Sequence, residues 1–153
     1  MTLALLLAAA AAVVEPFDPV EFFRGRTQGV GTLRPVLQKS KTIRVDSTGT
    51  EQKDGALLLT QTIHEPGKPP RTRTWRMRRD SPGRYSGSLS DASGPVRVSL
   101  EPGAIRIRYT GKDKLDFDQR LTAAGPRQVR NRMTIRRFGI VVARYDELIR
   151  KLD

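Results

Sequence analysis

The chain has 153 residues, a length that fits one domain with its own hydrophobic core. It contains no cysteine, which excludes disulfides, thiolate metal sites and attachment of a lipid through cysteine. There are 28 Lys and Arg residues against 16 Asp and Glu, a formal net charge of +12, so the charge favours anionic partners such as lipid headgroups, acidic polymers or nucleic acid.

An apolar stretch over residues 3–14 is the first predicted element. It is shorter than the roughly 20 residues that a membrane-spanning helix needs, and it matches the apolar part of a secretory signal. Ala10 and Ala12 form an A-x-A cleavage site, although Met1-Thr2 lacks the usual basic side chains. We therefore predict that residues 1–14 are a signal peptide, or else an uncleaved apolar helix, and that residues 15–153 form a single domain in the periplasm or cell envelope.

A short helical plug is predicted next. Asp18 can cap a helix, Pro19 suits its first position, and Gly25 can end it. Three nearby side chains would then cover one end of the domain: Phe17, Phe22 and Phe23.

From Gln28 to Arg137 the sequence alternates apolar and polar residues, and turns that contain Gly or Pro separate the segments. This alternation predicts strands with one face on a core and the other in water. The predicted strands are 28–36, 40–47, 55–64, 71–79, 84–91, 95–101, 104–110, 114–122 and 127–137. So many short strands at near-regular spacing predict a mainly β fold, either an antiparallel barrel or a sandwich.

A C-terminal amphipathic helix is predicted after Phe138-Gly139, which interrupts the last strand. Four apolar residues recur there at intervals of four, three and four: Val141, Tyr145, Leu148 and Leu152. Two ion pairs would support the helix: Asp146 with Arg150, and Glu147 with Lys151. We expect this helix on the outside of the β domain or across one mouth of it.

Several polar side chains share the parity of the core residues in their strands. They are Gln61, Arg73, Asp91, Gln119 and Asn131. A buried guanidinium without an anion is very costly, so an inward Arg73 needs a negatively charged partner. That partner is either Asp91, in a structural ion pair, or the carboxylate or phosphate of a ligand. The facing of 71–79 stays open, because the opposite parity could point inward instead, namely Thr72, Thr74, Arg76 and Arg78.

A few polar groups converging in an apolar cup are typical of a small-molecule site. An acyl chain or flat ring would lie against Trp75, Tyr85, Tyr109, Phe117 and Met133, with Arg73 holding an acidic head. The alternative is a barrel whose interior is filled by its own side chains.

Outward arginines could form a basic band that adheres to an anionic membrane or envelope polymer, or they could be an ordinary solvated surface. These residues are Arg84, Arg97, Arg106, Arg108, Arg130, Arg132 and Arg136. Nucleic acid is a weaker candidate, because the aromatic residues mostly share the parity of the core.

Catalysis finds little support in the sequence. His64 is the only histidine, no Gly-x-Ser-x-Gly motif occurs, and Asp116 and Asp118 lie on the polar face. We predict no catalytic residues, no metal site, no cofactor and no enzymatic activity.

An ordered set of motifs resembles a known family. The set comprises Phe22-Phe23-x-Gly25, Gly29-x-Gly31, Arg73-x-Trp75, Gly83-x-Tyr85-x-Gly87, Asp91-x-x-Gly94, Gly103-Ala104 with Tyr109, Asn131-Arg132-Met133 and Phe138-Gly139-Ile140. In this order they are similar to the bacterial envelope family catalogued as domain of unknown function 3833, from about Phe17 to the C-terminus. The resemblance implies a lipocalin-like fold and brings no catalytic residues. Many members are lipoproteins attached through a cysteine, which this chain lacks.

The combined prediction is an antiparallel lipocalin-like β-barrel of about 8–9 strands, with an N-terminal helical plug and a C-terminal helix. Its predicted function is non-catalytic binding of a lipid-like or amphiphilic anion by a monomer in the cell envelope. The alternative is a structural or adhesion protein with a packed barrel, which uses its basic exterior on an anionic membrane or envelope polymer.

Overall fold

The computed structural model describes residues 17–153, so the predicted leader at 1–14 lies outside the described residues. Ten antiparallel strands follow a one-turn helix, α1 (Pro19–Phe22). The strands are β1 (Gly25–Pro35), β2 (Lys41–Glu51), β3 (Leu57–His64), β4 (Arg71–Ser81), β5 (Arg84–Leu89), β6 (Arg97–Glu101), β7 (Ala104–Thr110), β8 (Asp116–Gly125), β9 (Gln128–Arg137) and β10 (Ile140–Lys151). The nine strands predicted from the alternation all occur, and β10 is an additional one.

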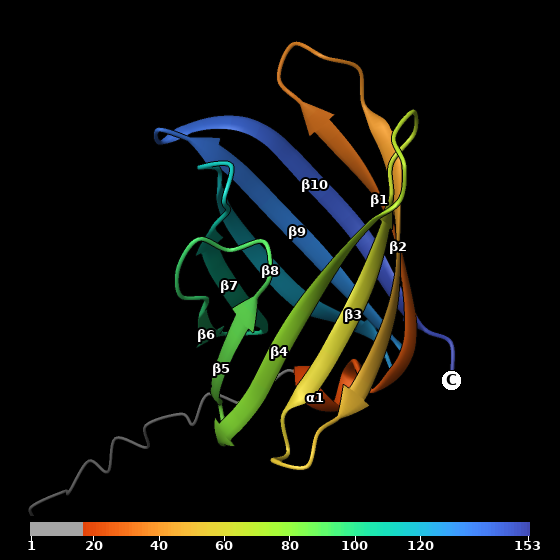
Figure 1. Cartoon of the computed structure of the whole chain (residues 1–153), viewed down its shortest axis with the longest axis vertical. Coiled ribbons are helices and arrows are strands. Elements are labelled where there is room, and N and C mark those ends of the chain that lie inside the picture. The colour runs from red at the N-terminus through yellow and green to blue at the C-terminus, as the bar shows by residue number, and fades with distance from the viewer. Residues whose placement is uncertain (1–16) are drawn as a thin grey trace, which may run out of the picture.

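The strands form one sheet that curls into a nearly closed, lipocalin-like barrel (Figure 1). The sheet order is β5-β4-β3-β2-β1-β10-β9-β8-β7-β6, so the first and last strands pair in the middle of the sheet. The two edge strands, β5 and β6, meet at a single bridge between Gly87 and Val96. The barrel therefore has one weakly paired seam.

Helix α1 lies at one end of the barrel, as predicted for the plug (Figure 1). The Asp18 carboxylate accepts a hydrogen bond from the Val20 amide at 2.9 Å, which caps the helix. Phe23 is buried, and Phe17 and Phe22 pack against the core beside it. Gly49 on β2 makes this possible, because a Cβ there would lie 1.8 Å from the Phe23 carbonyl oxygen.

The opposite end of the barrel carries the other set of connections. Because the odd-numbered strands run away from α1 and the even-numbered strands return, five connections lie there: 36–40, 65–70, 90–96, 111–115 and 138–139. We call this side the open end.

The alternation of the strands places the core as predicted. Most strands bury their apolar parity, as in β3, where Leu57, Leu59 and Ile63 are buried and Leu58 and Thr60 are not. On β4 the buried parity contains Trp75 and Met77, so Arg73 points inward and Thr72 and Thr74 do not share its face.

The predicted C-terminal helix is wrong, because residues 140–151 form strand β10. Tyr145 is buried, but Leu148 and Leu152 of the supposed apolar stripe are 39% and 46% exposed. Strands β1 and β9 offer hydrogen bonds along both edges of this segment, and that pairing outweighs its modest helical pattern. The predicted ion pairs are replaced as well, since Asp146 faces Arg130 and Arg132 from outside and Glu147 points inward.

Candidate ligand-binding site

A cavity of about 60 Å³ lies inside the barrel. Apolar residues of several strands form most of its wall, among them Trp75, Met133 and Ile149. Five polar or charged side chains also line it: Gln61, Arg73, Gln119, Asn131 and Glu147. The cavity is small beside the roughly 300–1,000 Å³ of drug-sized ligand pockets, so most of the barrel interior is filled by side chains.

Gln61 organises the polar groups on the β3–β4 side of the cavity. Its Oε1 accepts hydrogen bonds from Arg73 Nε and Trp75 Nε1, both at 2.8 Å. Its Nε2 donates to the Ser47 hydroxyl at 3.3 Å. Both lone pairs of the amide oxygen are thus occupied, and Gln61 fixes the orientation of Arg73 and Trp75.

Arg73 lies half-buried at the junction between the cavity and the open end. Within residues 17–153, no Asp or Glu carboxylate lies within 4.0 Å of its guanidinium, and its partner Gln61 is neutral. The predicted ion pair with Asp91 is wrong, because Asp91 bonds to Arg71 instead. Arg71 reaches Asp91 from the rim of the barrel, so within residues 17–153 Arg73 has no carboxylate in direct contact.

Glu147 on β10 is the least expected member of the site. Its side chain is 5% exposed and accepts a hydrogen bond from Asn131 Nδ2 at 3.0 Å. Burial raises the pKa of this carboxyl group, and the hydrogen bond from Asn131 and the charge of Arg73 oppose that shift. Gly29 on β1 provides the space, since a Cβ there would lie 1.9 Å from Glu147 Oε1.

Three buried polar atoms beside the cavity and the open end are among those that have no hydrogen-bond partner within residues 17–153. They are Asn131 Oδ1 and the hydroxyl groups of Tyr109 and Tyr145. Such atoms are rare in folded proteins unless water or a ligand satisfies them. Burial followed by the neighbouring Glu147 raises the pKa of Tyr145, so its hydroxyl stays protonated and can donate.

A wider pocket of about 410 Å³ opens above the cavity at the open end. We call it the mouth pocket; Arg71, Arg73, Asp91, Tyr109, Lys112 and Phe117 contribute to its lining. An aromatic wall connects the two spaces: Trp75 meets Tyr109 edge-to-face at 5.6 Å, and Tyr109 stacks on Phe117 at 4.8 Å. Arg73 lines both spaces and stands where they meet.

The structure brings together most of the residues predicted for a ligand site. Six of them line the cavity: Gln61, Arg73, Trp75, Gln119, Asn131 and Met133. Tyr109 and Phe117 line the mouth pocket. Tyr85 is buried in the core and pairs with Arg79 of β4, close to α1, so it lies at the other end of the barrel. Glu147 and Tyr145 were missed, although the period-two run Ala143, Tyr145, Glu147, Ile149 carried the signal.

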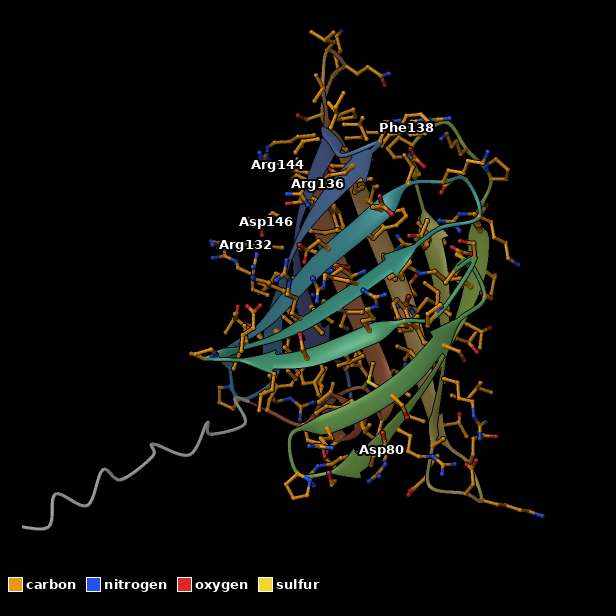
Figure 2. All side chains as sticks on the ribbon, turned by 90° about the vertical axis from the view of Figure 1, so that its left-hand side faces the viewer. Asp80, Arg132, Arg136, Phe138, Arg144 and Asp146 are labelled. Atoms are coloured by element: carbon orange, nitrogen blue, oxygen red, sulfur yellow. The ribbon has the colours of Figure 1, made fainter. Side chains whose placement is uncertain are left out.

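The predicted basic band lies on the outer wall, where Figure 2 shows Arg132 and Arg136 beside Arg144 and Asp146. Part of its charge is neutralised within the chain. Arg106 makes hydrogen bonds to Asp118 at 2.6 and 2.9 Å, and both Arg106 and Arg120 reach Glu101.

In residues 17–153 no group of three or more His, Asp or Glu could hold a metal ion. The same residues include no helix of the length and apolarity needed to cross a membrane.

Comparisons with known proteins place this geometry among lipocalin-like barrels. The family model described as "Protein of unknown function (DUF3833)" matches residues 7–151. The S-type phycobiliprotein lyase CPES from Guillardia theta superposes with a TM-score of 0.71 at 9% identity, over 88% of this chain and 90% of that one. A redesigned β-barrel covers 88% of this chain and 95% of its own, with a TM-score of 0.44 at 9% identity. The sequence matches none of the curated proteins with which it was compared.

Proposed function

Because this chain belongs to the DUF3833 family of proteins of unknown function, its role has to be inferred from its own barrel, and we propose that it binds a small amphiphilic anion there. In this proposal the protein is a non-catalytic monomer. It acts in the periplasm or cell envelope, as the apolar leader predicts. The acidic group of the ligand binds Arg73, and its apolar part lies along the aromatic wall.

The observation that carries the proposal is that Arg73 has no direct ion-pair partner within residues 17–153. A half-buried guanidinium bonded only to a neutral amide is a costly arrangement unless an anion completes it. A carboxylate or phosphate can accept two parallel hydrogen bonds from arginine, which gives orientation as well as affinity. Trp75 supports the same geometry from below, since the Arg73 guanidinium lies 5.7 Å from the centre of its ring.

The volumes set the size of the ligand. The cavity of about 60 Å³ accepts only a short apolar group, whereas the mouth pocket of about 410 Å³ has room for more. A ligand with a longer tail therefore requires the barrel to widen. The single bridge between β5 and β6 is the place where widening breaks the fewest hydrogen bonds.

Fluorescence can test the proposal, because Trp75 is the only tryptophan in the chain and lines the cavity. We expect octanoate to change the Trp75 emission saturably and 1-octanol, which has the same tail without the charge, to bind about tenfold more weakly. Arg73→Met should abolish that preference, and Arg73→Lys should keep part of it. The control is Arg76→Met, because Arg76 lies on the outer face of β4 and pairs with Asp54. This variant should bind octanoate and octanol like the parent protein.

Native mass spectrometry of protein purified gently from its own cells gives an independent test. We expect a non-covalently bound acidic compound in the parent protein and less of it in Arg73→Met. Equal octanoate and octanol affinities, together with repeated absence of a bound compound, would refute the proposal, provided that thermal melts show Arg73→Met to be folded.

A further inference from the structure

The most exposed large apolar side chains in residues 17–153 gather at the open end. Leu37 is fully exposed, and Phe138, Ile140 and Val36 are 81%, 69% and 53% exposed. Leu37 and Val36 belong to the β1–β2 connection, Phe138 belongs to the β9–β10 turn, and Ile140 is the first residue of β10. We call these four residues the hairpin tips. Single exposed apolar residues are ordinary, but four at the same end of the barrel are a candidate contact surface.

The β1–β2 connection borders the start of β10, although about a hundred residues separate the two segments in sequence. Pro35 is opposite Ala143 in the β1–β10 ladder, and the Val36 amide donates to the Val142 carbonyl at 2.9 Å. Figure 1 shows the β1–β2 loop and the start of β10 at the same end of the barrel, and Figure 2 shows Phe138 toward that end.

The backbone at both tips is unfavourable for the residues that occupy it. Leu37 has a φ of 61°, and Phe138 and Gly139 have φ values of 49° and 77°, which makes the β9–β10 connection a type I′ turn. Such positions favour Gly, Asn or Asp, and a bulky side chain there is an outlier. Neither turn geometry nor burial explains a Leu and a Phe at these two points.

Cations surround the tips. Arg34, Lys39, Arg137 and Arg144 are exposed, and within residues 17–153 none of them has a carboxylate within 4.0 Å. The Arg137 guanidinium lies 5.6 Å from the centre of the Phe138 ring, so charge and apolar surface are adjacent. Apolar groups at the extremity with basic groups set back from them match an anionic bilayer, whose hydrocarbon lies beneath charged headgroups.

We propose that the hairpin tips dock the open end of this barrel on a bilayer that contains anionic lipid. Leu37 and Phe138 insert below the headgroups, and the four cations bind the headgroups themselves. A second copy of the chain fits this surface poorly, because two chains of net charge +12 with the same basic rim repel each other. Docking in this way turns the mouth pocket toward the bilayer. The inference does not depend on a ligand in the barrel.

Co-sedimentation with vesicles tests the docking. We expect the full chain to bind phosphatidylcholine vesicles that contain 30% phosphatidylglycerol. A parallel preparation that lacks residues 1–16 should bind them too, which shows that the apolar leader is not responsible. Binding should weaken as NaCl rises from about 0.05 to 0.5 M, and pure phosphatidylcholine should bind at least about tenfold more weakly.

The decisive variant is Leu37→Asn with Phe138→Asn, because Asn tolerates positive φ and should leave the fold as stable as before or more so. We expect it to need about tenfold more lipid for half-binding. The matched control is Leu148→Asn with Val30→Asn, which removes two apolar side chains of 39% and 46% exposure from the wall of the barrel and should bind like the parent. Arg130→Gln with Arg132→Gln tests the basic band and should have a smaller effect than Arg137→Gln with Arg144→Gln.

Insertion itself can be observed with Phe138→Trp in a Trp75→Phe background, where position 138 carries the only indole. Its emission should shift to the blue on anionic vesicles and be quenched by brominated lipids. Equal loss of binding in the tip and wall variants, or an indole that stays in water, would overturn the proposal. So would sedimentation velocity that shows a dimer broken by the Asn variant, since the patch would then belong to a second copy.

Discussion

Glu147 is a carboxyl group enclosed in the barrel wall, and no Lys or Arg nitrogen of residues 17–153 lies within 4.0 Å of it. Its pKa in the folded chain is raised above the ordinary value of 4.5, chiefly by burial. The folded state therefore holds this proton more tightly than the unfolded state, and stability declines as pH rises above 4.5 toward the folded pKa. Gln has the same shape and keeps an acceptor for Asn131.

We predict that Glu147→Gln matches the parent protein below pH 4.5 and becomes the more stable of the two at higher pH. Urea unfolding at pH 4 and pH 8 measures the difference. A free-energy difference that is the same at both pH values, or a less stable variant at pH 8, would contradict the assignment of a buried carboxyl group.

Asp118 on the outer wall has a pKa shift opposite in direction to that of Glu147, so its effect on stability has the opposite pH dependence. Two hydrogen bonds from Arg106 hold its pKa below the ordinary value of 3.8, although partial burial opposes them. Its contribution is therefore present above pH 3.8 and lost as pH falls through the folded pKa. We expect Asp118→Asn to lower the free energy of unfolding by about 1 kcal/mol at pH 7, a value that allows for screening of a partly exposed pair. The deficit should vanish near pH 2.

At the scale of elements, the packing of α1 and Phe23 against β2 depends on the absence of a side chain at position 49. A Cβ on Gly49 would lie 1.8 Å from the Phe23 carbonyl oxygen, a backbone atom that cannot move without shifting the plug. We predict that Gly49→Ala lowers stability by about 1–3 kcal/mol, the usual cost of overpacking. The control is Gly94→Ala, where no atom lies within 4 Å of the new Cβ. Thermal melts should separate the two variants by several degrees, and equal melting temperatures would show that α1 is loosely held.

Element β10 also shows what the sequence could and could not predict. Strands with a single alternating pattern, such as β3, were located closely. Residues 140–151 satisfy two patterns at once, because Tyr145 belongs both to a helical stripe and to the period-two run that ends at Ile149. Hydrogen bonding to neighbouring strands decides between the helical and the extended conformation. A local sequence pattern does not reveal neighbouring strands that are far away in sequence. The same limit concealed Glu147, and it led us to pair Asp91 with Arg73, although Arg71 has the same parity and is the residue that bonds to Asp91.

At the scale of the whole molecule, the barrel is closed by hydrogen-bonded ladders everywhere except between β5 and β6. There the only bridge joins Gly87 to Val96, whereas β1 is bonded along its length to both β2 and β10. Local opening in proteins starts where few hydrogen bonds and apolar contacts have to break. The seam is therefore the place where a cavity of about 60 Å³ can enlarge to admit a longer ligand.

We predict that amide hydrogens of 84–101 exchange at least about tenfold faster than those of 27–33 and 143–149, since each unmade hydrogen bond lowers the cost of opening by about 1 kcal/mol. Exchange followed by mass spectrometry measures this. Saturating octanoate should slow exchange in both β5 and β6 if the tail enters through the seam, and Arg73→Met should remove that protection. Uniform slow exchange in the free protein would mean that the barrel is rigid, and binding would then be confined to the mouth pocket and to short apolar groups.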